Sequence, residues 1–263
     1  MNIRKCILVK NDCYKQGKSI RPAGIVVHST GANNPNLKRY VQPDDGILGV
    51  NTNKNDWNRG GISKCVHAFI GKDKHGIVKV YQTLPWTMRC WGCGSGNKGS
   101  YNNNYIQFEI CEDALTDANY FNNAFAAAIE LCAHLCKEYG IPVSKIVSHH
   151  EANAQGFASN HADCDHWLKR FGKDMDWFRA QVENSMGTPE KAIVSNLKKP
   201  IGASFKVRVK ASSLNIRKGA GVLNKKVGTI TNKGVYTIIE TKGNWGKLKS
   251  GAGWINLKYT ERI

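Results

Sequence analysis

The chain has 263 residues, of which 41% are hydrophobic and 22% are charged. The length suits one medium domain or two small ones, and the composition is that of an ordinary soluble globular protein. Lys and Arg number 38 against 20 Asp and Glu, a formal net charge of +18, and no run of about 18 apolar residues would insert into a membrane.

The N-terminus does not resemble a secretory signal. Its only apolar run, residues 6–9, is shorter than the roughly 7–15 apolar residues at the centre of a signal peptide. We therefore expect the protein to be made in the cytoplasm without a classical export signal. The nine cysteines, an odd number, favour free thiols over a disulfide framework.

Residues 1–183 combine strand-like runs with one long helical pattern. The strand-like runs occupy residues 23–29, 65–71, 76–82 and 105–111. Between the last of these and the segment KIVSHHE, apolar side chains from Phe121 to Tyr139 fall on one helical face, and Gly140 with Pro142 ends the helix. The pattern predicts an α/β domain, with a mixed central sheet and packed helices.

The C-terminal third differs from the rest in charge. From residue 186 onward there are 16 Lys and Arg and 3 Asp and Glu, a net +13, whereas the first 185 residues hold the remaining 22 and 17, a net +5. A module this basic favours a polyanionic partner: a nucleic acid, an anionic membrane or an anionic cell wall.

Residues 184–203 carry Gly, Pro and Ser without a sustained period, which predicts a linker. Residues 204–263 form short runs about every 8–10 residues, separated by Gly and Asn, as in a small all-β barrel. The runs LNIRKGAG, WGKL and GWIN resemble those of a bacterial SH3 domain. The resemblance implies a targeting module that binds peptidoglycan; a basic barrel that merely tethers is the alternative.

The densest chemistry lies in residues 145–171, which hold four of the eight histidines. His150 and Glu151 begin like an HExxH zinc helix, but Ala154 stands where the second His belongs, and the residues around it favour a loop. A catalytic zinc site needs three protein ligands and an open position. The candidates are therefore His28 at a strand end, one of the two adjacent histidines at 149 and 150, and a side chain from SNHADCD.

Four motifs, in the order VVHST, YIQFEICED, VSHHE and ASNHADCDHW, resemble those of zinc-dependent N-acetylmuramoyl-L-alanine amidases of the amidase-2 type. The resemblance covers about residues 20–180. It implies that His28, His149 and Asp163 bind Zn²⁺ and that His161 is a cation beside them. Cys164 is the alternative third ligand, because a thiolate binds zinc well and Cys occurs at this place in relatives.

Glu109 is the expected catalytic carboxylate. On its strand Ile106 and Phe108 share one face, whereas Gln107 and Glu109 share the other. A carboxylate buried there needs a partner or a function, and a solvent-facing Glu is the alternative. Many relatives carry a Tyr where this chain has Val66, so Glu109 is left with the role of the base.

The implied reaction is hydrolysis of the amide between N-acetylmuramic acid and L-alanine of the stem peptide, leading to cell-wall lysis. Zinc would activate water, Glu109 would transfer the proton, and a protonated His161 would stabilise the oxyanion. The expected partner is bacterial peptidoglycan rather than a nucleic acid. A phage endolysin or a prophage-derived autolysin, acting at the wall after release, fits these features.

Two other functions are compatible with the same residues. A recognition protein would bind peptidoglycan without cleaving it, and a zinc peptidase would cut inside the stem peptide. His67 is either a residue of the site wall or a packed core His. Residues 89–104 are a candidate substrate-recognition loop, and His166 is expected to make a structural hydrogen bond.

Overall fold

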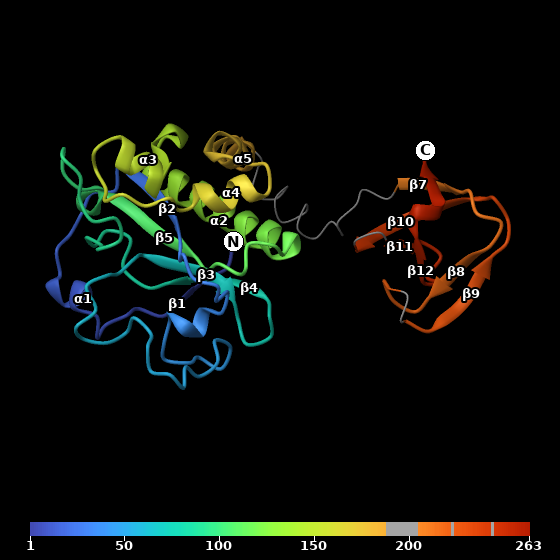
Figure 1. Cartoon of the computed structure of the whole chain (residues 1–263), viewed down its shortest axis with the longest axis horizontal. Coiled ribbons are helices and arrows are strands. Elements are labelled where there is room, and N and C mark those ends of the chain that lie inside the picture. Colours follow the sequence, from blue (N-terminus) through green and yellow to red (C-terminus); the bar gives the residue numbers. More distant parts are fainter. Residues whose placement is uncertain (188–204, 222–223, 243–244) are drawn as a thin grey trace. The chain divides into compact units, whose positions relative to one another are not determined.

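The computed structural model describes residues 1–187, 205–221, 224–242 and 245–263. The chain divides into two compact units, Met1–Gly187 and Thr188–Ile263 (Figure 1). Of the predicted linker, residues 188–203 lie outside the described residues. No helix in the described ranges is both long and apolar enough to cross a lipid bilayer.

The first unit is built on a six-stranded mixed sheet in the order β1-β4-β3-β5-β2-β6. Its strands are β1 (Ile3–Lys5), β2 (Gly24–Ser29), β3 (Ala68–Lys72), β4 (Val78–Gln82), β5 (Tyr105–Ile110) and β6 (Ile146–Ser148). Only the β3–β4 pair is antiparallel. The mixed sheet predicted from the sequence is confirmed.

The helices of this unit are α1 (Asp12–Gln16), α2 (Ala118–Tyr139), α3 (His149–Ala154), α4 (Asp165–Arg170) and α5 (Met175–Gly187), with 3₁₀ turns η1 (Leu37–Arg39), η2 (Tyr101–Asn103) and η3 (Val143–Lys145). The long α2 begins after Asp117, whose side chain accepts from two backbone N–H groups. It ends at Gly140, whose φ of 66° is the left-handed conformation that glycine adopts easily. The predicted helix and its end are therefore confirmed.

The two faces of the sheet are covered differently. Helices α2, α4 and α5 pack on one face, where Phe108, Phe125 and Trp167 belong to the largest apolar cluster (Figure 1). Loops and short turns cover the other face, around Tyr40 and Phe69. Loops leave space that a packed helix would fill, and the functional site opens on that second face.

Two local expectations were wrong. Residues 149–154 form the helix α3 and not a loop, because Ser148 and Glu151 make a capping box. In it each side chain accepts a hydrogen bond from the backbone N–H of the other residue. The last helix of this unit, α5, continues to Gly187, so residues 184–187 belong to it and not to a linker.

The second unit is a seven-stranded antiparallel sheet in the order β13-β7-β10-β11-β12-β8-β9. Its elements are β7 (Phe205–Val209), β8 (Leu214–Arg217), β9 (Lys226–Ile230), β10 (Val235–Lys242), β11 (Trp245–Leu248), β12 (Trp254–Asn256), η4 (Leu257–Tyr259) and β13 (Thr260–Arg262). Alternating apolar residues of these strands, such as Val207 and Val209, form its core. The all-β prediction is confirmed.

Candidate active site

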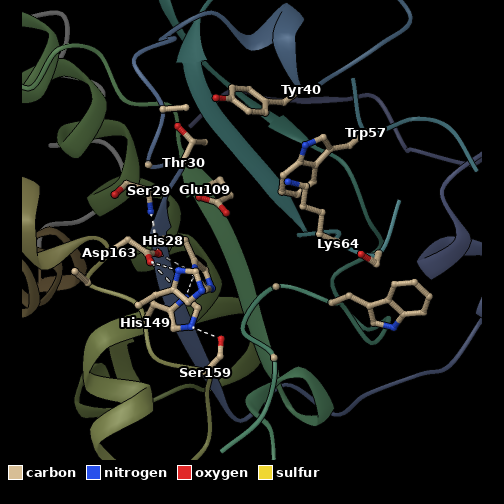
Figure 2. Close-up of a pocket in the computed structure, with 18 of the residues that line it drawn as sticks. His28, Ser29, Thr30, Tyr40, Trp57, Lys64, Glu109, His149, Ser159 and Asp163 are labelled. Carbon is tan, nitrogen blue, oxygen red and sulfur yellow. Dashed lines mark hydrogen bonds and ion pairs between the residues drawn. The ribbon is translucent and has the colours of Figure 1, made fainter. Parts of the chain in front are cut away.

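The three predicted zinc ligands converge on the sheet face that is covered by loops, near the end of β2 (Figure 2). His28 lies near the end of β2, His149 is the first residue of α3, and Asp163 precedes α4. Their nearest atoms lie close together: His28 Nδ1 is 3.1 Å from His149 Nδ1 and 3.1 Å from Asp163 Oδ2. Among the described residues this is the one group of three such side chains close enough to share a metal ion.

The ring nitrogen of His28 that faces away from His149 and Asp163, here called its outer nitrogen, is hydrogen-bonded to Gln107. His28 Nε2 lies 2.9 Å from Gln107 Oε1, and Gln107 Nε2 donates to Asn102 Oδ1 at 3.0 Å. Asn102 Oδ1 also accepts from the backbone N–H of Gly92 and Cys93, which fixes its orientation. The amide oxygen of Gln107 therefore accepts from His28 Nε2–H, and a neutral imidazole protonated there has a lone pair on Nδ1.

The outer nitrogen of His149 is held in the same way by Ser159. The Ser159 hydroxyl donates to the Cys93 carbonyl at 3.1 Å, so it accepts from His149 Nε2–H at 3.3 Å. His149 Nδ1 thus also carries a lone pair. Two lone pairs and a carboxylate that face one another repel unless a cation lies between them, and this donor set fits Zn²⁺.

Asp163 supplies the carboxylate of this group. Burial raises the pKa of Asp163, but hydrogen bonds donated by His149 and His28, together with positive charge on those rings, outweigh burial and hold that pKa well below its usual range. When both Nδ1 atoms carry lone pairs instead, a cation between the three groups takes over that effect. The neighbouring Cys164 points elsewhere: its Sγ lies 4.0 Å from Met175 Sδ inside the apolar cluster. Of the two alternatives for the third ligand, only Asp163 faces the histidines.

Gly92 allows the Gln107 side chain to approach. A Cβ atom built on Gly92 would lie 2.3 Å from Gln107 Oε1 and 3.0 Å from a methyl group of Val66. No side chain fits in that space without displacing the amide that holds His28. The loop at residues 89–104 thus reaches the converging histidines through Gly92 and Asn102.

Glu109 lies beside the three converging side chains. It is in register with His28 on the adjacent parallel strand, so both side chains point to the same face of the sheet. Burial, followed by the nearby charges of Asp163 and Glu112, raises the pKa of Glu109 well above its ordinary value. Its Oε2 atom has no hydrogen-bond partner among the described residues. The solvent-facing alternative is therefore wrong.

A pocket of about 720 Å³ contains this site (Figure 2). Besides the converging side chains it is lined by aromatic residues Tyr40, Trp57 and Trp91 and by Arg39 and Lys64. The Lys64 ammonium lies 5.0 Å from the centre of the Trp57 ring. Aromatic and cationic side chains together suit a ligand with sugar rings or amides and an anionic group.

An ion pair between His166 and Glu112 borders the pocket. His166 Nε2 lies 3.0 Å from Glu112 Oε1, and this hydrogen bond raises the pKa of His166. The Ser29 hydroxyl donates to the same carboxylate oxygen. His166 thus makes the structural hydrogen bond that was expected, although it also lines the pocket.

The remaining predicted histidines differ in position. The His161 side chain is 62% exposed, its ring stacks on that of His149 at 4.7 Å, and its Nδ1 lies 3.8 Å from Asp163 Oδ1. His150 is exposed. His67 is fully buried, accepts from the Gln107 N–H and contacts the Met88 carbonyl, so it is the packed core His of the two alternatives.

Three residues of the site were not predicted from the sequence: Gln107, Ser159 and Tyr40. Gln107 was placed on the correct strand face but given no role, although it shares that face with Glu109 and reaches His28. Ser159 carried no signal beyond its closeness to the histidines. Tyr40 lines the pocket from the residue after η1 and could not be placed by any local pattern.

The sequence matches one family of known proteins. Residues 18–166 match the family described as N-acetylmuramoyl-L-alanine amidase. The amidase CwlA of Bacillus sp. is 24% identical over 191 residues, which are 68% of this chain and 72% of CwlA. CwlH of Bacillus subtilis (strain 168) is 28% identical over 151 residues, 57% of this chain and 52% of CwlH, so the match spans about half of that relative.

Solved structures share the fold. The structure of PlyL has a TM-score of 0.50 at 22% identity, covering 69% of this chain and 97% of PlyL. The hydrolase AmiA of Staphylococcus aureus also has a TM-score of 0.50, at 18% identity, covering 71% of this chain and 83% of AmiA. Both matches cover a share of the chain close to that of its first unit.

Proposed function

Because the chain belongs to the N-acetylmuramoyl-L-alanine amidase family and is an amidase of peptidoglycan, we propose that it works with a zinc ion held by His28, His149 and Asp163. The bond cleaved joins N-acetylmuramic acid to L-alanine of the stem peptide. The observation that carries the proposal is the meeting of two unprotonated Nδ1 atoms and a carboxylate beside Glu109.

Zinc bound there would supply a Lewis acid for the scissile carbonyl and lower the pKa of water. The chain's own residues supply proton transfer. Glu109 sits in register with His28, and its raised pKa suits a group that accepts a proton from water and returns it to the leaving amine. A divalent cation would lower that pKa toward the working range. His161, near Asp163, would add positive charge at the rim.

The second unit is proposed to be an SH3-like module that binds the cell wall. Residues 205–263 hold 13 Lys and Arg against 2 Asp and Glu, and both acidic side chains, Glu240 and Glu261, already pair with a lysine. On β7 the cations Lys206 and Arg208 face outward and are exposed. Such a surface favours an anionic, insoluble partner such as the wall.

Action at the bacterial wall after release from the cell is part of the same proposal. The expected origin in a phage or prophage stays a prediction.

The test is a digestion of purified cell walls with and without a zinc chelator, followed by mass spectrometry of the new ends. The proposal expects free L-alanine amino termini and glycan strands freed of peptide, no new reducing sugars, and loss of both products with chelator. The variant His149→Ala should behave like the chelated protein. His134→Ala is a matched control, since that histidine lies on the exposed side of α2 and pairs with Glu138.

Other outcomes point to the alternatives. Cuts within the stem peptide would identify a peptidase. Walls that bind the protein but yield no new ends would identify a recognition protein and overturn the enzymatic proposal.

A further inference from the structure

Two buried polar atoms in the pocket lack a hydrogen-bond partner among the described residues: the Tyr40 hydroxyl and Glu109 Oε2. The other such atoms, on Asp165 and Trp167, do not line it. A buried polar group left without a hydrogen-bond partner destabilises the folded state, so a protein that keeps one calls for an explanation. Glu109 has one as the proposed base, whereas Tyr40 has none.

The Tyr40 ring is held firmly in place. It stacks on Phe69 with ring centres 5.2 Å apart and planes 11° apart, and it meets Trp57 edge to face at 6.1 Å. Trp57 in turn packs against Phe69 at 4.9 Å. Tyr40 is only 4% exposed, so its hydroxyl has little freedom to find another partner.

The sheet places this hydroxyl next to the reacting groups. Phe69, Glu109 and His28 are in register across the neighbouring strands β3, β5 and β2, so their side chains form one row on the same face. Tyr40 lies over the first member of that row. Its hydroxyl points toward Thr30 and Glu109, on the side of the pocket opposite the converging histidines (Figure 2).

The hydroxyl is a neutral donor. Burial raises the pKa of Tyr40 to about 12, so the phenol keeps its hydrogen near neutral pH. The adjacent Thr30 lowers that pKa, but no hydrogen bond of normal geometry joins the phenol to a described residue. An acceptor must come from outside the described residues.

We propose that Tyr40 is a substrate-binding residue, whose hydroxyl donates a hydrogen bond to a carbonyl oxygen of the muramoyl-peptide on the Glu109 side of the pocket. The inference rests on the proposed amidase function. Tyr40 keeps its proton, and no covalent bond changes at this residue. A site with an unpaired donor also rejects ligands that lack the matching oxygen, so Tyr40 contributes to specificity.

The test compares Tyr40→Phe with Tyr81→Phe in the full zinc-loaded chain. Tyr81 is an equally buried tyrosine of the same apolar cluster, but its hydroxyl donates to Asp45 at 2.8 Å and does not line the pocket. With a soluble muramoyl-peptide, Tyr40→Phe should lower kcat/KM about tenfold, the loss expected for one hydrogen bond. Tyr81→Phe should leave kcat/KM within about twofold.

Thermal unfolding separates binding from a structural role. Removing an unpartnered hydroxyl should leave the Tm of Tyr40→Phe unchanged or higher, whereas Tyr81→Phe should lower its Tm. An unchanged kcat/KM for Tyr40→Phe, or a Tm loss like that of the control, would overturn the inference. If the wild type itself releases no L-alanine termini, the proposed function has failed instead.

Discussion

The two sides of the pocket differ in how their polar atoms are satisfied. On the side that we propose binds zinc, here called the metal side, His28 and His149 each have an outer nitrogen that is hydrogen-bonded by a neighbour. These neighbours, Gln107 and Ser159, are themselves held by Asn102 and by the Cys93 carbonyl. On what we call the unpartnered side, Glu109 beside the histidines and Tyr40 farther from them each carry a buried oxygen without a hydrogen-bond partner among the described residues. The Nε2 atoms of the first side are satisfied within the chain, whereas we propose that bound substrate satisfies the oxygen atoms of the second.

This difference suggests a division of roles. Ligands fixed by outer hydrogen bonds hold a metal in one geometry before substrate arrives. Unpartnered groups instead make their best contacts in the complex, where they contribute to rate or selectivity. Substitutions on the two sides should therefore affect different measurements: zinc affinity on the first and turnover on the second.

The largest effect is expected on the unpartnered side, for Glu109→Gln. Loss of a general base costs roughly 10²–10⁴-fold in kcat. Zinc content should not change. The Tm should stay level or rise, because burying a neutral amide costs less desolvation free energy than burying a carboxylate. The measurement is kcat on soluble muramoyl-peptide together with zinc analysis of the same sample.

Glu130→Gln is the matched control for that experiment. Glu130 is a half-buried carboxylate on α2, and burial raises its pKa too, but it lies outside the pocket. A Glu109→Gln protein that retained wild-type kcat, or that lost zinc, would contradict the division between the two sides.

A second prediction concerns His67, which lies beneath the metal side and accepts the N–H of Gln107. Burial lowers the pKa of His67 to about 4, from about 6.5 in the unfolded chain. The unfolded state therefore binds the proton first as the pH falls. The stabilising effect of the neutral ring is complete above pH 6.5 and is lost between pH 6.5 and 4, by about 3 kcal/mol.

Denaturant unfolding at several pH values tests this. His67→Gln can still donate to the Met88 carbonyl but does not titrate, so its unfolding free energy should fall less than that of the wild type on acidification. Parallel curves for the two proteins would show that His67 does not carry the pH dependence.

The third prediction is specific to the metal side. Gln107→Leu removes the acceptor of His28 Nε2–H and should weaken zinc binding 10–100-fold, the usual effect of losing an outer hydrogen bond. At saturating zinc, kcat should recover most of its value. Competition with a coloured chelator measures the affinity.

Gly92→Ala offers a milder version of that change. Its added methyl would displace Gln107 Oε1 without removing it, so the loss of affinity should be smaller and in the same direction. Equal zinc affinity in wild type and Gln107→Leu would show that Gln107 does not hold His28 in its ligand form.

Much of the fold could be predicted because its signals are local. Strict alternation in β5 identified both the strand and the face that carries Glu109, and Gly140 marked the end of α2. The helix α3 was missed because its capping box stood among residues that favour loops. Cap geometry over four residues outweighed the propensity of those that follow.

Residues of the candidate site likewise divide into those that local pattern predicts and those that it does not. His28, Glu109 and Gln107 lie on strands, where register alone decides which side chains meet. Tyr40 and Ser159 come from loops whose path depends on packing far away in sequence, so no local spacing predicts them. The ligand set itself came from a family resemblance, and the outer hydrogen bonds could be found only in three dimensions.

The smallest effect is expected at the rim, for His161→Ala. The His161 side chain is 62% exposed, stacks on His149 and lines the pocket. It does not hydrogen-bond the outer nitrogen of His28 or of His149. Water and salt screen a charge there, so kcat should fall less than about tenfold, and the difference should shrink in high salt.

Measuring kcat of wild type and His161→Ala at low and high ionic strength decides between two roles for that ring. A modest loss that disappears in salt fits a cation that attracts substrate from the rim. A loss above about 100-fold that salt does not change fits a donor at the oxyanion, because such donors act in a water-excluded complex. His161 would then belong with Tyr40 and Glu109, as a third group whose contacts are completed only by substrate.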